Sequence, residues 1–337
     1  MKAFVIKDGF GLEGLKEVEK PELRPGPKEV LLKLRAASLN YRDLLTVEGN
    51  YSPDQPLPLI PLSDGVGEVV ETGAEVSRVK TGDRVAGIFA QQWLTGNPTI
   101  SMLNSTLGGP LDGMLTEQTV LHEDGLVHVP DHLTDEQAAT LPCAAVTAWN
   151  ALITIGGLKA GQSVLVQGTG GVSVFALQFA KMLGARVLII SSSDKKLAHA
   201  KKMGADEAIN YRSVPQWEKE VLALTGGLGV DHVVEVGGAG TLQKSIQVVR
   251  FGGQVSMIGI LSGLETHLNF IPILMNRIRV QGIYVGHRES FIEMNRAIHA
   301  NRLTPVVDRT FSFAEAVDAF RLMQEGRHFG KICLHMD

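Results

Sequence analysis

A glycine-rich turn is the stretch of this sequence whose residue types point most directly to a chemistry. It reads Gly168-Thr-Gly170-Gly171-Val-Ser173, close to Gly-x-Gly-x-x-Gly with serine in the third glycine place. Glycines let the backbone approach a pyrophosphate, and a helix N-terminus offers free N–H groups and a partial positive charge. The serine is small enough for close helix packing, and we expect its hydroxyl to cap the helix or donate to a phosphate. The expected cofactor contacts at this turn are Gly168, Thr169, Gly170, Gly171 and Val172.

The elements that must position this turn flank it directly. Val164–Val166 is a short apolar run of the kind found in strands buried on both faces. A helical apolar stripe over 174–183 follows the turn and ends at Gly184, and a second apolar run follows at 187–190. This order predicts a βαβ unit that binds a dinucleotide.

The residues after the second strand bear on which nucleotide binds. An NAD site usually has Asp or Glu there, but this strand ends in Ser191 and Ser192. Serine leaves room and hydroxyl donors for a 2′-phosphate, which favours NADP(H) over NAD(H), although Asp194 is close enough in sequence to reach a ribose. For each of the lysines Lys195 and Lys196, the alternative is a position on the solvent-exposed face of a helix. The cations and donors expected around the phosphate are Lys195, Lys196, Tyr211 and Arg212.

Two later strands end in glycine and are expected to pass their backbone along the cofactor. Gly237-Gly238 follows the apolar run Val233–Val236. Gly259, Ile260 and Leu261 follow the run Val255–Ile258. Ligands of open α/β sheets collect at such carboxyl ends of parallel strands.

The pattern of apolar segments changes twice along the chain, and these changes predict its domain organisation. The first 120 or so residues carry short apolar segments separated by Gly, Pro and Asp, as in a compact, partly barrel-like antiparallel domain. Residues 90–113 are polar and glycine-rich, typical of a long surface loop or of a lid over a substrate. From about residue 127, helices and apolar strands alternate, which predicts a doubly wound parallel sheet, and the last 50 residues return to the first pattern. We therefore expect a Rossmann domain over 127–283, inserted into a β-rich catalytic domain over 1–126 and 284–337.

The composition narrows the class of protein. The chain has 337 residues, 44% of them apolar, with a net charge of −4, which argues against nucleic acid or an acidic membrane as a partner. No apolar run approaches the roughly 20 residues that span a bilayer. The N-terminal residues are unlike a signal peptide, and Cys143 and Cys333 are too few for a disulfide framework. A cytoplasmic protein is the expectation.

Several motifs together resemble the medium-chain dehydrogenase/reductase superfamily, and most closely its zinc-free quinone oxidoreductase branch, similar to ζ-crystallin, with its alcohol-dehydrogenase-like relatives. The resemblance covers essentially the whole chain. It implies a GroES-like catalytic domain around a Rossmann domain, commonly in a dimer. The motifs that carry it are the glycine-rich turn, Asn40-Tyr-Arg-Asp43, Pro61-Leu-Ser-Asp-Gly-Val-Gly67, Leu141-Pro-Cys-Ala-Ala-Val-Thr-Ala148, Met203-Gly-Ala205, Ile209-Asn-Tyr211 and Phe329-Gly-Lys-Ile332.

The metal positions of that superfamily are altered in this sequence. Zinc-using relatives begin their first metal motif with Cys and their second with His-Glu, whereas this chain has Asn40 and Ser63-Asp64. Cys143 stands at the third ligand position, and residues 90–113 contain no cysteine for a structural zinc. One cysteine cannot hold zinc, which takes about four ligands. The sequence therefore predicts no metal, and Cys143 is interpreted as a small apolar neighbour of the cofactor.

Without a metal, hydride transfer from reduced nicotinamide to a conjugated acceptor is easier than alcohol oxidation, because no Lewis acid lowers the pKa of an alcohol. The resemblance therefore implies NADPH-dependent reduction of a quinone or an α,β-unsaturated carbonyl. Asn40 and Thr147 resemble residues that contact the nicotinamide half of the cofactor. The proposed donors to the substrate oxygen are Tyr41, Asp43 and Tyr51, with packing or structural hydrogen bonding as their alternatives. Lys331 and Arg327 are expected to reach the cleft or to lie on the surface.

The sequence also allows two other functions, and the resemblance implies a homodimer. The first is an NAD(P)-linked alcohol dehydrogenase that relays protons through Tyr, Asp or His, with His287 as a candidate against its simpler role as a strand-end surface residue. The second is a nucleotide-binding protein without turnover. A homodimer is implied by resemblance, through a strand at Val280–Val285 beside the helical stretch Pro272–Ile278, whose apolar Ile271, Ile273 and Leu274 suit a buried interface.

Overall fold

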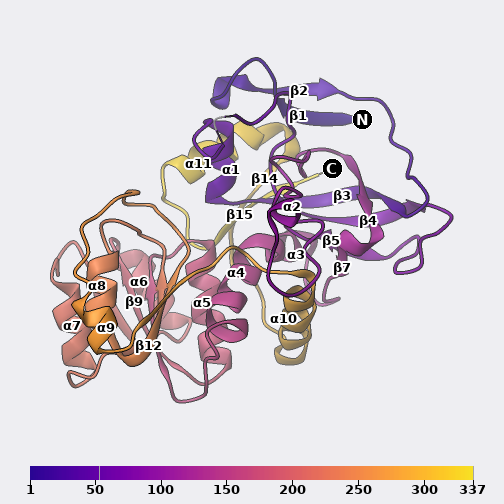
Figure 1. Ribbon diagram of the computed structural model, residues 1–337. Helices are drawn as coiled ribbons and strands as arrows, with labels where there is room; N and C mark the ends of the chain where they lie inside the picture. The colour runs from indigo at the N-terminus through magenta and orange to yellow at the C-terminus, as the bar shows by residue number, and fades with distance from the viewer. Residues whose placement is uncertain (53, 337) are drawn as a thin grey trace. The chain divides into compact units, whose positions relative to one another are not determined.

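The structure, a computed structural model, describes residues 1–52 and 54–336 and divides the chain into two compact units (Figure 1). The first unit comprises Met1–Val146 with Gly286–Asp337, and the second comprises Thr147–Val285. An inserted central segment is thus present, as the sequence predicts. Residues 127–146 pack with the first unit, however, so the first boundary lies about twenty residues later than expected.

The second unit is built on a six-stranded sheet in the order β10-β9-β8-β11-β12-β13, with every neighbouring pair parallel. Strand order reverses between β8 and β11, the place where doubly wound sheets bind ligands. The strands are β8 Ser163–Gln167, β9 Arg186–Ser191, β10 Glu207–Asn210, β11 Val230–Glu235, β12 Val249–Met257 and β13 Arg279–Gly282.

The crossover helices follow the strands as the apolar periodicity predicts. The core between helices and sheet includes Leu165, Leu188, Val233 and Val255, which are fully buried. Three of these helices end just before a glycine (Gly184, Gly204 and Gly226), and the helix that ends at Val248 runs directly into the next strand. The helices are α5 Gly171–Met182, α6 Asp194–Lys202, α7 Trp217–Leu224, α8 Leu242–Val248 and α9 Ile271–Met275.

The first unit contains a seven-stranded sheet and a separate β1–β2 hairpin. Its order is β14-β15-β3-β4-β5-β7, with β6 also paired to β3, and every pair except β14–β15 is antiparallel. The eleven-residue β3 pairs with β4, β6 and β15, so it is the central strand of this unit. The strands are β1 Lys2–Ile6, β2 Leu15–Glu19, β3 Glu29–Leu39, β4 Asp64–Thr72, β5 Arg84–Gly87, β6 Gln118–His122, β7 Leu126–His128, β14 Val307–Ser312 and β15 Lys331–His335.

Helices of the first unit are short except near its C-terminal end. Residues 90–113, for which the sequence predicts a long loop, form an irregular stretch that contains one short helix, α2 (Ile100–Leu103). From Asp135 to Thr154, α-helical turns alternate with two π-helical segments, Leu141–Ala145 and Asn150–Thr154, and this stretch carries the chain into the second unit. The α-helices are α1 Tyr41–Val47, α2 Ile100–Leu103, α3 Asp135–Ala139, α4 Val146–Trp149, α10 Arg288–Asn301 and α11 Ala316–Gln324.

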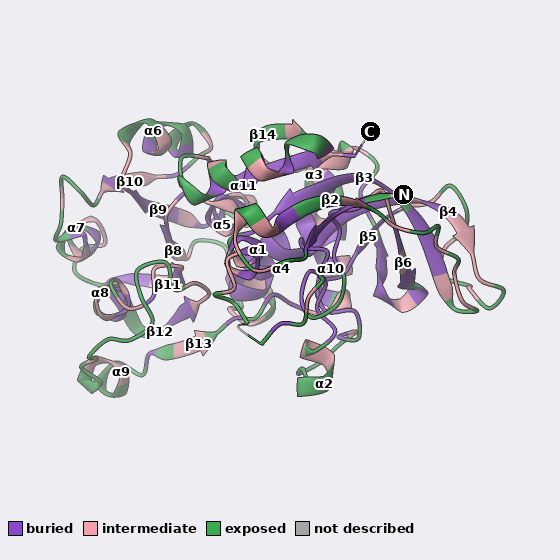
Figure 2. Ribbon diagram, turned by 90° about the horizontal axis from the view of Figure 1, so that it is seen from above, coloured by how far each residue is buried: buried purple, intermediate pink, exposed green. Residues whose placement is uncertain are grey.

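Burial follows the sheets. Strands β3, β8 and β9 are largely buried in Figure 2, while the short helices α2 and α9 are exposed. The core of the first unit includes Ile6, Leu32, Leu59 and Phe320. Across the described residues, no helix has both the length and the apolar character to cross a bilayer.

Two expected elements differ from the structure near the end of the second unit. The strand expected at Val280–Val285 is Arg279–Gly282, and its last pair, Met257 with Gly282, lies where the partner strand β12 ends. The helix expected at Pro272–Ile278 is only Ile271–Met275, and Arg277 beyond it has φ +52°. A positive φ interrupts a helix of L-residues, which explains why the helix stops before Arg277, while the strand stops with the end of its partner.

Candidate functional site

The glycine-rich turn lies at the carboxyl end of β8 and opens α5, as predicted. Gly168 has φ +72°, a value that favours glycine, and its N–H donates to Ile190 O on the neighbouring strand at 2.8 Å. Gly170 is the N-cap of α5, and it has no side chain that could cap the helix. The N–H groups of the first helical turn have no carbonyl partner within the helix. This end of the helix therefore fits a phosphate group.

Ser173 has a different role from either one expected for it. Its Oγ donates to Gln167 O at 2.6 Å, and the residue is buried. The hydroxyl thus closes the turn between β8 and α5 and neither caps the helix nor donates outward. The buried serine fits the close packing expected here, while the predicted use of its hydroxyl is wrong.

The loops after β11 and β12 lie at the same edge of the sheet and are bonded to each other. Ser262 N and Oγ both donate to Gly237 O at 2.7 Å, and Leu261 N donates to Val236 O at 3.3 Å. A Cβ on Gly238 would approach Ile260 Cα to 2.8 Å, so this contact requires glycine. Both loops are thus held side by side at the edge that carries the glycine-rich turn.

Glu235, the last residue of β11, anchors this edge. It is fully buried, and its Oε1 accepts hydrogen bonds from Gly237 N at 2.8 Å and Gly238 N at 3.0 Å. Its Oε2 accepts from Gln167 Nε2 at 2.7 Å and from the Ser245 hydroxyl. A buried carboxylate is tolerated only when its oxygens are fully bonded, and these donors meet that need. Glu235 therefore fixes the path of the loop expected to contact the cofactor.

The end of β9 carries the residues expected at the adenosine ribose. Ser191 is buried, Ser192 is half-buried, and Ser193 is the N-cap of α6, with its Oγ accepting from Lys196 N at 3.4 Å. The Asp194 carboxylate accepts from Asn210 Nδ2 at 2.8 Å, on β10. The structure therefore gives this carboxylate a protein donor. The neighbouring Tyr211 is exposed, and its N–H donates to Ser191 O at 3.1 Å.

In the first unit, Asn40 and Asp43 form the capping box of α1. The Asp43 carboxylate accepts from Asn40 N at 2.8 Å and from Ser63 N at 3.3 Å. Asp43 is fully buried and also pairs with Arg42 at 3.1 Å. Its geometry is that of an acceptor that orients its neighbours, the alternative recognised from the sequence, and it has no surface from which to reach a substrate.

A chain of four buried side chains continues from Asn40. Lys331 Nζ donates to Asn40 Oδ1 at 2.6 Å, and Asn40 Nδ2 donates to Ser63 Oγ at 3.4 Å. Ser63 Oγ donates to Asp64 Oδ1 at 2.7 Å. We call these four residues the Lys331–Asp64 chain. It joins the last strand of the unit, β15, to the start of α1 and the start of β4.

Burial governs the electrostatics of this chain. It raises the pKa of Asp64 to about 6, against the opposing effect of the Lys331 charge. Cys143 donates its backbone N–H to Asp64 Oδ2 at 3.1 Å, and burial together with the Asp64 charge raises the pKa of its thiol. The Cys143 side chain is thus a poor nucleophile, consistent with its interpretation as an apolar neighbour.

A zinc ion does not fit the residues at the superfamily's metal positions. Asn40 and Ser63 supply an amide and a hydroxyl in place of thiolate and imidazole, and both are bonded within the Lys331–Asp64 chain. Among residues 1–52 and 54–336, no group of three or more His, Cys, Asp and Glu side chains lies close enough to hold a metal ion. The positive charges in this part of the unit are the side chains of Lys331 and Arg42.

The two tyrosines proposed as donors are both accessible. Tyr41, the first residue of α1, is 45% exposed, and Tyr51 is 40% exposed. Arg42 lies between them in sequence, and its guanidinium lies over the Tyr51 ring, 4.7 Å from the centroid. Both residues are thus partly accessible to a substrate, whereas Asp43 is fully buried.

The remaining candidates are placed individually. Thr147 is buried at the start of the second unit, within α4. His287 is not a strand-end residue as expected, because its Nδ1 accepts from Ser290 N and caps α10. Burial lowers its pKa, so it is a weak proton carrier at neutral pH. Arg327 is exposed and pairs with Glu325 on the surface.

Two residues of the site were not identified from the sequence. Glu235 was counted only as part of an apolar strand, although a carboxylate between Val234 and Val236, just before two glycines, is a recognisable signal. Arg42 lies within the Asn40-Tyr-Arg-Asp43 motif, which does not indicate its role. In the structure its NH1 and NH2 donate to the carbonyls of Leu107, Gly108 and Gly109, at 3.0 to 3.1 Å, in the loop stretch 90–113. Such a non-local set of partners leaves no local pattern.

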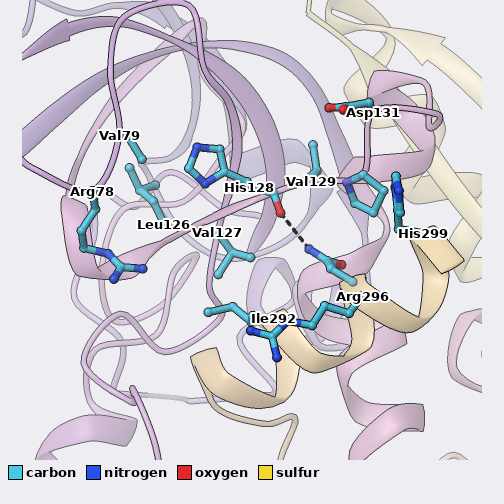
Figure 3. Close-up of a pocket in the computed structure, with 12 residues that line it drawn as sticks. Arg78, Val79, Leu126, Val127, His128, Val129, Asp131, Ile292, Arg296 and His299 are labelled. Carbon is cyan, nitrogen blue, oxygen red and sulfur yellow. Dashed lines mark hydrogen bonds between the residues drawn. The ribbon is translucent and has the colours of Figure 1, made fainter.

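A separate groove of about 520 Å³ lies in the first unit between β7 and α10 (Figure 3). Its walls include Val127, Ile292 and Arg296, and the His128 carbonyl accepts from Asn295 Nδ2 at 2.9 Å. None of the described residues that line it belongs to the candidate set. It is therefore not counted with the site.

Comparisons with known proteins agree on one family. Residues 26–131 match the alcohol dehydrogenase GroES-like domain, and residues 171–300 match the family described as zinc-binding dehydrogenase. The chain is 44% identical to the zinc-type alcohol dehydrogenase-like protein C1773.06c of Schizosaccharomyces pombe, over 99% of each chain.

Solved structures extend the same result. A putative alcohol dehydrogenase from Sinorhizobium meliloti 1021 matches with a TM-score of 0.92 and 39% identity, covering 99% of this chain and 98% of that one. A quinone oxidoreductase from Pseudomonas syringae pv. Tomato DC3000 matches with a TM-score of 0.83 and 29% identity, over 99% of both. Full-length similarity at these levels carries the fold and the cofactor class together, and the chain therefore belongs to the medium-chain dehydrogenase/reductase superfamily of NAD(P)-dependent oxidoreductases.

Proposed function

We propose that this protein is an NADPH-dependent, zinc-independent oxidoreductase that transfers hydride to a quinone or an α,β-unsaturated carbonyl. The observation that carries the proposal is the Lys331–Asp64 chain, because it uses the side chains of the superfamily's metal positions for hydrogen bonds. An alcohol bound there would meet no Lewis acid to lower its pKa. A conjugated acceptor does not need one.

The second unit fits a nicotinamide dinucleotide, which supplies the hydride when bound. The free N–H groups at the start of α5 suit the pyrophosphate, and the glycine at position 168 keeps the backbone close. Glu235 holds the loop from Gly237 to Gly238 in place, and this loop holds that of Gly259, Ile260 and Leu261. These residues bind and orient the cofactor and take no part in bond breaking.

The first unit supplies hydrogen-bond donors for the acceptor oxygen. Tyr41 and Tyr51 are exposed residues that carry hydroxyl groups, and Asn40 beside them is buried, with 8% of its surface exposed. Such donors stabilise negative charge that develops on an oxygen, and a tyrosine hydroxyl or a water molecule then provides the proton. We assign these roles to Asn40, Tyr41 and Tyr51, while Asp43 orients Asn40.

NADPH is preferred over NADH in this proposal. The strand β9 ends in Ser191, which brings no negative charge to the place of the 2′-phosphate. Lys196 and Tyr211 lie at the start of α6 and after β10, two elements that pack against β9. Asp194 is bonded to Asn210, which gives this carboxylate a partner within the protein in place of a ribose.

A homodimer through the edge of the second unit's sheet completes the proposal. Strand β13 is the last strand of the sheet order, and the adjacent helix α9 exposes Phe270, Ile271, Leu274 and Met275 by 65% to 77%. A cluster of exposed apolar side chains beside an open strand edge is typical of a protein interface. A second copy of the chain would extend the sheet and cover the cluster.

Two kinds of assay on the purified protein test the activity. NADPH oxidation is followed with 1,4-benzoquinone and with a simple enone, and NAD(P)⁺ reduction is followed with primary and secondary alcohols, each before and after treatment with a chelator. Turnover of the quinone or enone that survives chelation supports the proposal. Turnover of alcohols alone, lost on chelation, would overturn it in favour of a metal-dependent alcohol dehydrogenase.

The same set of assays tests the alternative that this protein binds the nucleotide but catalyses no reaction. The relevant outcome is tight NADPH binding, followed by fluorescence, with no oxidation for any acceptor. The accessible hydroxyls of Tyr41 and Tyr51 argue against it, because neither packing nor capping requires them.

A further inference from the structure

The Lys331–Asp64 chain has a charged group at each end and two neutral groups between them. Lys331 is 3% exposed, Asn40 is 8% exposed, and Ser63 and Asp64 are fully buried. Lys331 Nζ also donates to Leu39 O at 2.5 Å. These groups come from β15, from the N-cap of α1 and from β4 with the residue before it, so the chain depends on the tertiary fold.

The two charged ends set the direction of every hydrogen bond between them. A protonated lysine has only donors, and an ionised carboxylate has only acceptors. Asn40 must therefore turn its Oδ1 to Lys331 and its Nδ2 to Ser63, and the Ser63 hydroxyl must point its proton at Asp64. Reversing the Asn40 amide would set its NH2 group against the ammonium. The orientation of this amide is consequently determined by chemistry as well as by geometry.

We propose that Lys331 is a positioning residue which, with Asp64, fixes the Asn40 amide so that its Nδ2 group is always the end offered as a donor to a bound carbonyl or enolate oxygen. This inference rests on the proposed function in that it takes Asn40 to contact the cofactor or the acceptor. It differs from the expectation that Lys331 itself binds cofactor, because both of its hydrogen-bond partners here are protein oxygens.

The charges around Asp64 make the chain sensitive to pH. Lys331 and Cys333 face Asp64 from β15, Asp43 faces it from α1, and Cys143 faces it from the π-helical segment. Lys331 is the positive charge that favours ionised Asp64, while burial and Asp43 favour the protonated form, and the pKa of Asp64 is about 6. A protonated Asp64 can itself donate a hydrogen bond, so the Ser63 hydroxyl no longer has to donate its proton to Asp64. The Asn40 orientation then loses the Ser63 constraint and keeps those of Lys331 and of the capping box, in which its side chain accepts from Asp43 N.

The test compares Lys331→Met with Lys331→Arg and Ser63→Ala, and uses Lys20→Met as the matched control. Lys20 pairs with Asp112 on the surface of the same unit. For Lys331→Met we expect kcat to fall roughly tenfold to a hundredfold, as when a preorganised donor is lost, while the dissociation constant of NADPH changes less than about threefold. The acidic limb of the pH–rate profile should move to higher pH. Ser63→Ala should lower kcat in the same direction, Lys331→Arg should retain part of kcat, and Lys20→Met should behave as wild type.

Two outcomes would overturn the inference. One is a large rise in the NADPH dissociation constant for Lys331→Met with kcat unchanged at saturation, which would mean that the lysine binds the cofactor directly. The other is a wild-type kcat and pH profile in both Lys331→Met and Ser63→Ala. If Lys331→Met does not fold, the decision passes to Ser63→Ala, which removes one hydroxyl and leaves both charges in place.

A measurement without turnover separates this inference from the proposed function. The free energy of unfolding is measured against pH for a protein with Asp64 and for its Asp64→Asn variant, and the difference between the two curves gives the pH at which Asp64 titrates. The pair is measured once with Lys331 present and once in the Lys331→Met background. Removing the Lys331 charge should raise this pH, and an unchanged value would contradict the inference. Wild-type protein that fails to reduce quinones or enones would contradict the proposed function alone.

Discussion

The Arg42 guanidinium lies 4.7 Å from the centre of the Tyr51 ring, and this pair joins a buried ion pair to an accessible hydroxyl. The Arg42 side chain is only 10% exposed, pairs with the fully buried Asp43 and donates to three carbonyls of the loop 107–109. One side chain thereby supports the capping box of α1, a turn of the long loop and the ring of a candidate proton donor.

We expect Arg42→Met to destabilise the fold by about 3 kcal/mol, because it leaves the Asp43 carboxylate buried without its cation. It should also raise the KM for the acceptor, since the Tyr51 ring loses the charge that lies over it. Urea denaturation and steady-state kinetics measure the two effects. Arg35→Met, which removes a half-exposed pair with Glu68, is the control, and a similar loss of stability in both variants would contradict the assignment.

Asp64 should make the stability of the protein fall with rising pH over a narrow window. Its pKa is about 6 in the folded protein against an ordinary value of 3.8. Between these values the unfolded chain has released this proton while the folded state keeps it, so raising the pH favours unfolding. At about pH 6 half of the folded molecules still hold this proton, so the effect is complete about one pH unit higher, where both states are ionised.

The size of this effect follows from the shift in pKa. The difference in unfolding free energy between wild type and Asp64→Asn should change by about 3 kcal/mol in all between about pH 3 and pH 7, at about 1.4 kcal/mol per pKa unit, and by about 2 kcal/mol between pH 4 and pH 6. Urea titrations at a series of pH values measure it. The pKa of Asp83 is lowered chiefly by a hydrogen bond from the backbone N–H of Lys80. The difference in unfolding free energy between wild type and Asp83→Asn should therefore change with pH in the opposite direction. A flat difference curve for Asp64→Asn would show that the carboxylate is not held as described.

Local patterns were sufficient to predict the parts of the fold built from neighbouring residues. The run Val164–Val166, the helical stripe after it and the glycine at 184 predicted β8, α5 and β9 within a few residues. The capping box of Thr134 and Gln137 likewise sits where the N-cap of α3 was predicted. Both features are set by the chain within a few positions, and the sequence shows them directly.

Partners far apart in the chain could not be predicted in the same way. Lys331 and Asn40 are separated by 291 positions, and their bond exists only because β15 pairs with β3. Strand β14, with the sequence Val-Asp-Arg-Thr-Phe-Ser, was missed because its charged residues hide the alternation expected of a strand. The candidate residues Asn40 and Lys331 were thus selected by resemblance, while their mutual bond required the structure.

Glu235 offers a prediction that concerns cofactor binding alone. Glu235→Gln turns one carboxylate oxygen into an NH2 group, which would face donors already pointing at it, whichever way the amide is placed. Each donor left without an acceptor costs about 1 to 3 kcal/mol, so the loop at Gly237 should loosen and NADPH should bind at least about tenfold more weakly. Fluorescence titration measures the affinity. Glu207→Gln, which removes a half-exposed pair with Arg186, should leave the affinity as it is. Equal affinities for wild type and Glu235→Gln would mean that the loop does not contact the cofactor.

Lys196 tests the choice of nucleotide. If it meets the 2′-phosphate, Lys196→Ala should weaken NADPH binding by roughly tenfold to a hundredfold, the worth of one charge-assisted hydrogen bond, and change NADH binding little. Ser191→Asp should act in the same sense, because it places a negative charge at the end of β9. Lys202→Ala, on the exposed face of the same helix, is the control. Equal losses for both nucleotides in Lys196→Ala would remove this lysine from the phosphate site.

Leu274 tests the dimer at the open edge of the second sheet. It is 77% exposed on α9, between the equally accessible Ile271 and Met275 and close in sequence to β13. Leu274→Asp would place a charge in an apolar interface, where its desolvation is not repaid, so it should convert dimer to monomer in sedimentation velocity experiments at micromolar concentration. Ile100→Asp, on the exposed α2 of the first unit, should leave the assembly unchanged and shows that the effect is specific to this surface. A wild-type protein that sediments as a monomer, or a Leu274→Asp variant that remains a dimer, would show that the exposed cluster beside β13 is not where two copies meet.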